Sequence, residues 1–118
     1  MTEAKATRQG YGDGLLEVGK SNPNVVVVDA DLGDSTKAEI FGKEFPDRYI
    51  TTGIAEQDMI GIAAGLAVSG KIPFASTFAI FSERAFEFVR NIISRNKINV
   101  KIAGSHAGIH TGEDGKSA

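Results

Sequence analysis

Short apolar runs alternate along the chain with longer segments whose apolar residues recur at helical spacing. The run Val25-Val26-Val27-Val28 is continuous and β-branched, which is typical of a strand buried on both faces. Further strands are predicted at 48–51, 71–76 and 99–103, between turn or helical segments. Strands that alternate with helices predict an α/β fold, a three-layer sandwich with a mainly parallel sheet covered on both faces.

Four segments predict the covering helices. They span 6–20, a stretch from Ser35 as N-cap to about Phe45, 55–69 and 79–95. Glycines at 10, 12 and 14 lower the helix propensity of the first segment. In the last segment one face carries the apolar residues, namely Phe81, Ala85, Phe88 and Ile92.

The helix predicted over 55–69 is almost free of charge after its first turn. Such a helix is expected to be buried on both sides. Gly61 and Gly65 lie four residues apart and form a flat stripe on one face. The stripe serves either tight packing within this domain or a helix–helix seam with a partner subunit, and the sequence leaves both interpretations open.

Glu56 stands where a strand end, a glycine turn and this apolar helix meet. Open α/β sheets bind their ligands at that kind of junction. A carboxyl group at the edge of an apolar environment needs a specific partner or a proton. The structural alternative is a capping box, with Gly53 as N-cap and Glu56 as its reciprocal partner.

The amino-acid composition excludes several classes of function. The chain has 118 residues, 42% apolar and 24% charged, a net charge of −2 and no cysteine. These values predict one soluble domain without a broad basic surface for nucleic acid, a disulfide framework or thiol catalysis. No run is long enough for a membrane span. A cytoplasmic location is expected, and the basic residues at 84, 90, 95, 97 and 101 are expected to form a solvated face.

Five motifs, in order and spacing, resemble the pyrimidine-binding domain of transketolase, and most of all the separately encoded C-terminal subunit of split transketolases. They are Asp29-Ala30-Asp31-Leu32, Phe45-Pro46-Asp47-Arg48-Tyr49, Gly53-Ile54-Ala55-Glu56-Gln57, Ser76-Thr77-Phe78-Ala79-Ile80-Phe81 and Gly112-Glu113-Asp114-Gly115. The resemblance implies a thiamine diphosphate-binding fold with one pyrimidine-binding domain over 1–118. It also implies that the diphosphate-binding and C-terminal domains are absent, so a fragment is expected.

The resemblance implies a transferase that moves a two-carbon ketol unit from a ketose phosphate to an aldose phosphate in the pentose phosphate pathway. Its cofactor would be thiamine diphosphate, with Mg²⁺ or Ca²⁺ held by the missing domain and no metal ligand here. Glu56 matches the catalytic glutamate that bonds to the pyrimidine nitrogen N1′. Phe78 and Phe81 match ring-stacking positions, and Asp31 and Ile54 match positions that line the cofactor pocket.

Four further residues match substrate positions of the family. His106 would contact the sugar and assist proton transfer, and Asp114 would read the donor's hydroxyl configuration. Arg8 and Ser35 would bind the sugar phosphate. The structural alternatives are an exposed loop histidine, a solvated N-terminal charge and a helix cap. Arg84 stands where transketolases often carry a third aromatic residue.

Other enzymes and classes remain open at this point. 1-Deoxy-xylulose-5-phosphate synthase and the beta subunit of 2-oxo acid dehydrogenases share parts of the pattern, although His106 favours transketolase. A phosphoacceptor receiver needs an aspartate where Ser76-Thr77-Phe78 stands. A non-catalytic α/β binding module is the remaining alternative. In the transketolase case, the chain alone is expected to be inactive and to need a diphosphate-binding domain or subunit, in a homodimer or heterotetramer.

Overall fold

A four-stranded parallel sheet organises the protein. The computed structural model describes residues 4–109 and 112–117. The strand order is β2-β1-β3-β4 and every pairing is parallel. The strands are β1 (Val25–Asp29), β2 (Tyr49–Thr51), β3 (Ile72–Phe78) and β4 (Lys101–Ser105). The predicted α/β fold and parallel sheet are confirmed, although β3 and β4 each end two residues later than predicted.

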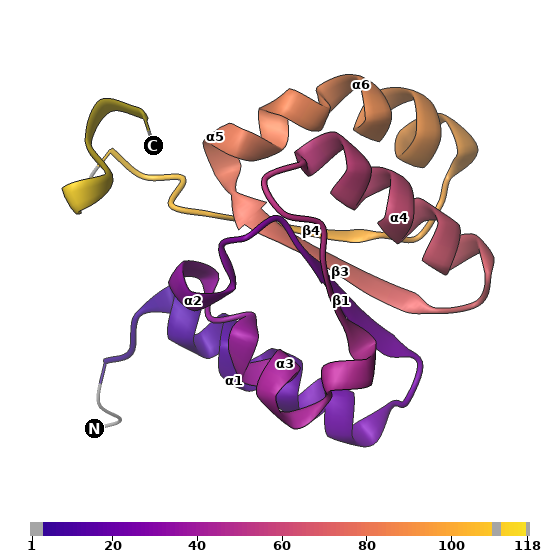
Figure 1. Ribbon diagram of the computed structural model, residues 1–118, viewed down its shortest axis with the longest axis horizontal. Coiled ribbons are helices and arrows are strands. Elements are labelled where there is room, and N and C mark those ends of the chain that lie inside the picture. Colours follow the sequence, from indigo (N-terminus) through magenta and orange to yellow (C-terminus); the bar gives the residue numbers. More distant parts are fainter. Residues whose placement is uncertain (1–3, 110–111, 118) are drawn as a thin grey trace.

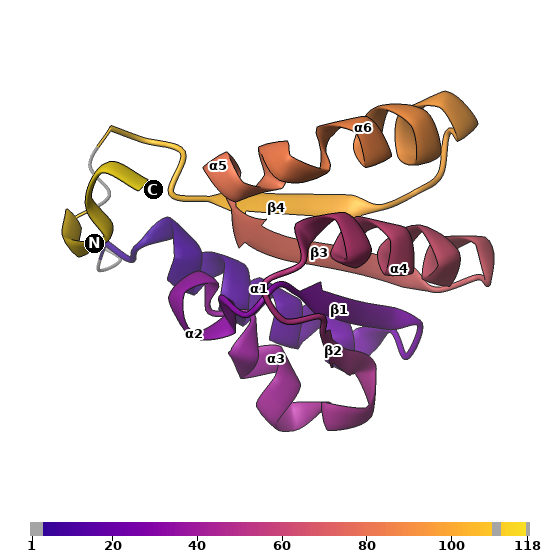
Figure 2. The ribbon, with the colours of Figure 1, turned by 45° about the horizontal axis from the view of Figure 1, so that its top comes forward.

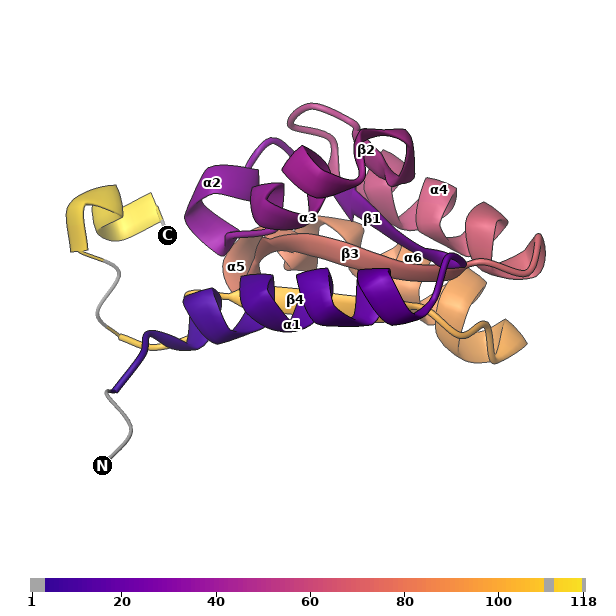
Figure 3. The ribbon, with the colours of Figure 1, turned by 90° about the horizontal axis from the view of Figure 1, so that it is seen from below.

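Helices cover both faces of the sheet (Figure 1, Figure 2). One face carries α1 (Thr7–Ser21), α2 (Gly33–Thr36), α3 (Glu39–Glu44) and the short 3-10 turn η1 (Pro46–Arg48). The other face carries α4 (Glu56–Val68) and the segment α5 (Ala79–Ser82), η2 (Glu83–Ala85), α6 (Phe86–Phe88) and η3 (Val89–Ser94). Helix α1 runs along β3 and β4, while η4 (Gly112–Ser117) stands away from the sheet (Figure 3).

Two apolar clusters, one on each face of the sheet, form the core. The α4 side packs Val28, Ala30, Met59, Ile60, Ala63, Ala64, Ala75, Ala85 and Ile93, and the α1 side packs Leu15, Val25, Val27, Ala38 and Phe41. All five residues of β1 are buried, as its β-branched run predicts. Among the described residues, no helix is both long and apolar enough to cross a membrane.

The helix predicted from Ser35 to Phe45 is wrong, because the chain breaks it at Lys37. Lys37 has φ 68°, which ends α2 and separates it from α3. Ser35 lies inside α2 and caps neither helix. The hydroxyl of Thr36 stabilises the break: it donates to the Leu32 carbonyl at 3.0 Å and accepts the Ala38 N–H at 3.3 Å.

The predicted helix over 79–95 exists but is irregular. A 3-10 turn at Glu83–Ala85 and a π-type turn at Val89–Ser94 interrupt the α-helical pitch. These changes of pitch rotate the apolar face. Ala85 and Ile93 are buried, while Phe88 and Ile92 are only half-buried.

Helix α4 buries one face only, so the prediction of burial on both sides is wrong for this chain. Cβ atoms placed on Gly61 and Gly65 would meet nothing within 4 Å, and Val68 is 74% exposed. The stripe therefore does not serve packing inside the domain. A seam with a partner subunit stays a prediction.

Arg48, from the Phe-Pro-Asp-Arg-Tyr motif, clamps the start of β1 to the end of α1. Its guanidinium donates to the carbonyls of Gly19 at 3.0 Å, Asn22 at 3.1 Å and Val25 at 3.3 Å. It also lies 3.9 Å from the centroid of the Phe45 ring, a cation–π arrangement. These contacts give the arginine of the motif a structural role in the fold.

Candidate functional site

Loops at the carboxyl ends of β1 and β2 meet helix α4 and the α5–η2 segment around a cavity of about 250 Å³. The register aligns the last residues of β1 and β2, Asp29 and Thr51, and pairs Asp29 with Ser76, two residues before β3 ends, so the carboxyl ends of these strands lie at one edge of the sheet. The cavity is lined by Ala30, Asp31, Leu32, Ile54, Glu56, Phe81 and Arg84. Four of the five predicted cofactor-binding residues are therefore brought together: Asp31, Ile54, Glu56 and Phe81.

Glu56 is buried, with 3% of its surface exposed, and forms an ion pair with Arg84. It is the first residue of α4, and the N-cap is Ala55, without a side-chain cap. The capping-box interpretation is therefore wrong. The Arg84 Nε lies 3.5 Å from Glu56 Oε2, so the carboxyl group has the specific partner that its position demands. Arg84, 65% exposed at its side chain, is not merely part of a solvated face.

Asp29 holds the loop that carries Asp31. It is 2% exposed, and its Oδ1 accepts the Leu32 N–H at 3.3 Å. Burial raises the pKa of the Asp29 carboxyl, while a hydrogen bond from Tyr49 opposes the rise. Asp31 adopts φ 65° in this turn. The sequence shows Asp29 only as an acidic strand end, and its positioning role depends on Tyr49, which lies on another strand.

Stability should respond to pH through Asp29. Because its folded-state pKa lies above the ordinary 3.8, the folded protein holds this proton more tightly than the unfolded chain. The contribution of Asp29 to the free energy of unfolding therefore falls as pH rises from about 3.8 through the raised pKa. Asp29→Asn, which cannot titrate, should gain stability relative to wild type across that window in urea unfolding. A difference independent of pH would contradict this assignment.

Phe78 supports the site from behind and does not line the cavity. It is 2% exposed and stacks on Phe81, with ring centroids 5.6 Å apart and planes 9° apart. Its other neighbour is the His106 ring at 3.9 Å. The Nδ1 atom of His106 lies 2.8 Å from Ser105 Oγ. Phe78 thus connects Phe81 with His106 in one row of rings.

His106 borders a second hollow of about 430 Å³, apart from the Glu56 cavity. Its lining also includes Ala79, Ile80, Glu83, Ala107, Gly108, Lys116 and Ser117. Lys116 and Ser117 belong to η4, which carries Asp114 at its exposed surface. The structure brings His106 beside the segment that holds Asp114, and it places neither residue against Glu56.

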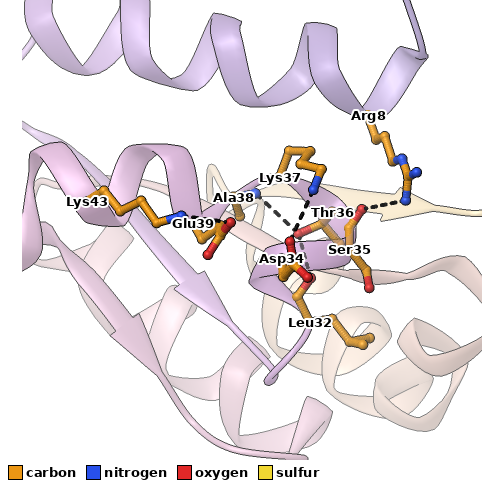
Figure 4. Close-up of polar contacts among 9 residues, drawn as sticks. All are labelled: Arg8, Leu32, Asp34, Ser35, Thr36, Lys37, Ala38, Glu39 and Lys43. Atoms are coloured by element: carbon orange, nitrogen blue, oxygen red, sulfur yellow. Dashed lines mark hydrogen bonds and ion pairs between the residues drawn. The ribbon is translucent and has the colours of Figure 1, made fainter.

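Arg8 and Ser35 are brought together at the start of α1 (Figure 4). The Arg8 guanidinium donates to the Ser35 carbonyl at 3.4 Å. Arg8 lines a third hollow, of about 200 Å³, with Thr7, Tyr11, Thr36, Ala103, Gly104 and Ser105. Ser35 is not a helix cap, so the structural alternative for it is wrong. Arg8 contacts its backbone carbonyl, and Ser35 is not among the residues that line this hollow, so a shared phosphate site stays a prediction.

Comparison with known proteins decides the family. A family model described as the pyrimidine binding domain of transketolase matches residues 3–118. The chain belongs to this transketolase family. A putative transketolase C-terminal section from Methanocaldococcus jannaschii is 56% identical over 96% of this chain and 36% of its own length. Human transketolase is 44% identical over 95% of this chain and 18% of its own length.

Solved transketolase structures share the fold. A structure described as a split gene transketolase, inactive beta4 tetramer, is 57% identical with a TM-score of 0.78, over 86% of this chain and 34% of that one. The transketolase of Campylobacter jejuni is 33% identical with a TM-score of 0.83, over 95% of this chain and 18% of that one. The synthase, dehydrogenase and non-catalytic alternatives are not favoured. The chain spans about a third or less of the length of these relatives.

Proposed function

We propose that the chain is the pyrimidine-binding part of an enzyme that transfers a two-carbon ketol unit from a ketose phosphate to an aldose phosphate. The observation that carries the proposal is the convergence of Asp31, Ile54, Glu56 and Phe81 on one cavity with a buried carboxyl group. Membership of the transketolase family supports it.

The residues of the cavity fit the aminopyrimidine ring of thiamine diphosphate. Ile54 and the half-buried Phe81 offer apolar walls, and the Glu56 carboxyl offers one polar group for a ring nitrogen. When bound, thiamine diphosphate supplies the carbanion chemistry of its thiazolium carbon. Glu56 holds and moves a proton at the pyrimidine N1′, and Asp31 and Phe81 orient the ring.

A second subunit or domain completes the site. Among residues 4–109 and 112–117, no group of three or more His, Cys, Asp or Glu side chains could hold a metal ion. That partner is proposed to bind the diphosphate group and its Mg²⁺ or Ca²⁺. The assembled enzyme is proposed to be a cytoplasmic homodimer or heterotetramer. The relative described as an inactive beta4 tetramer supports this requirement.

Reconstitution tests the proposal. The chain is mixed with the diphosphate-binding subunit, thiamine diphosphate and Mg²⁺, and ketol transfer between a ketose phosphate and an aldose phosphate is followed. Transfer is expected from the mixture and not from either component alone. An inactive mixture in which the two subunits demonstrably associate would contradict the proposed function.

Asp114 is proposed to select the sugar donor together with His106. Arg8 and Ser35 are proposed to bind the sugar phosphate. Asp114→Ala in the assembled enzyme should raise the donor KM by about tenfold and weaken the preference between hydroxyl epimers, because one hydrogen bond to the sugar is lost. Glu113→Ala, the neighbouring exposed carboxylate, is the matched control. Equal effects of the two changes would remove Asp114 from the substrate site.

A further inference from the structure

The Glu56 carboxyl stands among acidic groups. Two adjoining hollows border it, and their linings together include Asp31, Asp58 and Arg84. Within these linings Arg84 is the one cation beside three carboxyl groups. A carboxylate with 3% exposure loses most of its hydration, and a nearby opposite charge offsets that loss.

Two adjacent residues of α4 hold Arg84 at this place. The Glu56 carboxylate contacts its Nε at 3.5 Å. The next residue, Gln57, donates its side-chain N–H to the Arg84 carbonyl at 3.1 Å. The 3-10 turn of η2 contains Arg84. Both the backbone and the side chain of Arg84 are thus attached to the first turn of α4.

We propose that Arg84 is a positioning residue for Glu56: it is the counter-ion that stabilises the buried carboxylate and aims it at the cavity, and Gln57 fixes Arg84 for this purpose. The role of Arg84 in catalysis rests on the proposed function of Glu56. The pairing itself is a property of the free chain. Arg84 does not contact the reacting atoms in this role, and it acts through the Glu56 carboxyl.

A double-mutant cycle on the free chain tests the pairing by thermal unfolding. Arg84→Met keeps much of the apolar stem and removes the charge. It should lower Tm by about 4–8 °C at pH 8, because Glu56 loses its counter-ion. In Glu56→Gln/Arg84→Met, the loss caused by Arg84→Met should largely disappear, since no buried charge remains. Arg84→Lys should recover part of the loss.

The exposed ion pair between Glu87 and Arg90, at 2.7 Å, is the matched control. The same double-mutant cycle at this pair should give a coupling of about 2 °C or less in Tm, because both side chains are solvated. Couplings of equal size at the two pairs would overturn the proposal. If Arg84→Met alone does not fold, folding of the double variant supports the pairing and its failure to fold contradicts it.

A measurement on the assembled enzyme distinguishes failure of this inference from failure of the proposed function. Full ketol transfer by Glu56→Gln would end the proposed role of Glu56 in catalysis. The unfolding cycle on the free chain would still decide whether Arg84 is its counter-ion.

Discussion

Replacing Glu56 by glutamine is expected to leave the fold intact and to reduce ketol transfer by the assembled enzyme by about 10²–10⁴-fold, the usual size of a general acid–base contribution. The amide can still hydrogen-bond to a ring nitrogen but cannot move a proton. The fold should persist because glutamine matches glutamate in shape and removes a buried charge. Steady-state kinetics and circular dichroism of the same preparation measure both effects.

Asp58 provides the matched control for Glu56. It lies in the first turn of the same helix and borders the adjoining hollow, but it is exposed. Asp58→Asn should change turnover little. A similar loss in both variants would point to a general electrostatic effect at the start of α4, and near-normal turnover of Glu56→Gln would remove Glu56 from catalysis.

Replacing Arg48 by methionine should destabilise the free chain by about 2–4 kcal/mol, since several charge-assisted hydrogen bonds are lost. The carbonyls of Gly19, Asn22 and Val25 would lose their donor, and the rings of Phe41 and Phe45 would lose the cation that lies over them. Chemical unfolding by urea measures the change. Arg48→Lys should recover only part of it, because one ammonium group cannot match the planar guanidinium.

Arg95→Met is the control for Arg48. Arg95 is exposed, and its guanidinium donates a hydrogen bond to the Asn91 side-chain oxygen at 3.2 Å. Its replacement should alter the free energy of unfolding by about 0.5 kcal/mol or less. Loss of stability at Arg95 equal to that at Arg48 would show that the clamp does not hold β1 to α1.

The edge of the sheet that carries the site could be predicted from the sequence. A continuous β-branched run is a local signal for a buried strand, and Val25 to Val28 form the buried strand β1 as expected. In a parallel sheet the carboxyl ends of neighbouring strands share one edge. The loop residue Asp31 and the helix start at Glu56 therefore had to approach each other, and they do.

The partner of Glu56 could not be predicted in the same way. Arg84 reaches the carboxyl group from a 3-10 turn, and a regular helix over 79–95 would aim it differently. The break at Lys37 was missed for a related reason: a left-handed lysine has no local sequence signal, unlike glycine. Helix α4 was predicted as buried on both sides from its apolar composition, but composition does not reveal that the face with Gly61 and Gly65 is open in this chain.

The central claim, that Glu56 activates the cofactor's aminopyrimidine, is tested most directly by hydrogen–deuterium exchange at the thiazolium carbon. The chain is assembled with the diphosphate-binding subunit and thiamine diphosphate, and exchange is followed by NMR without any sugar. Glu56→Gln should slow exchange by about 10²–10⁴-fold, while Asp114→Ala should leave it unchanged. Exchange in Glu56→Gln at the wild-type rate would contradict the account.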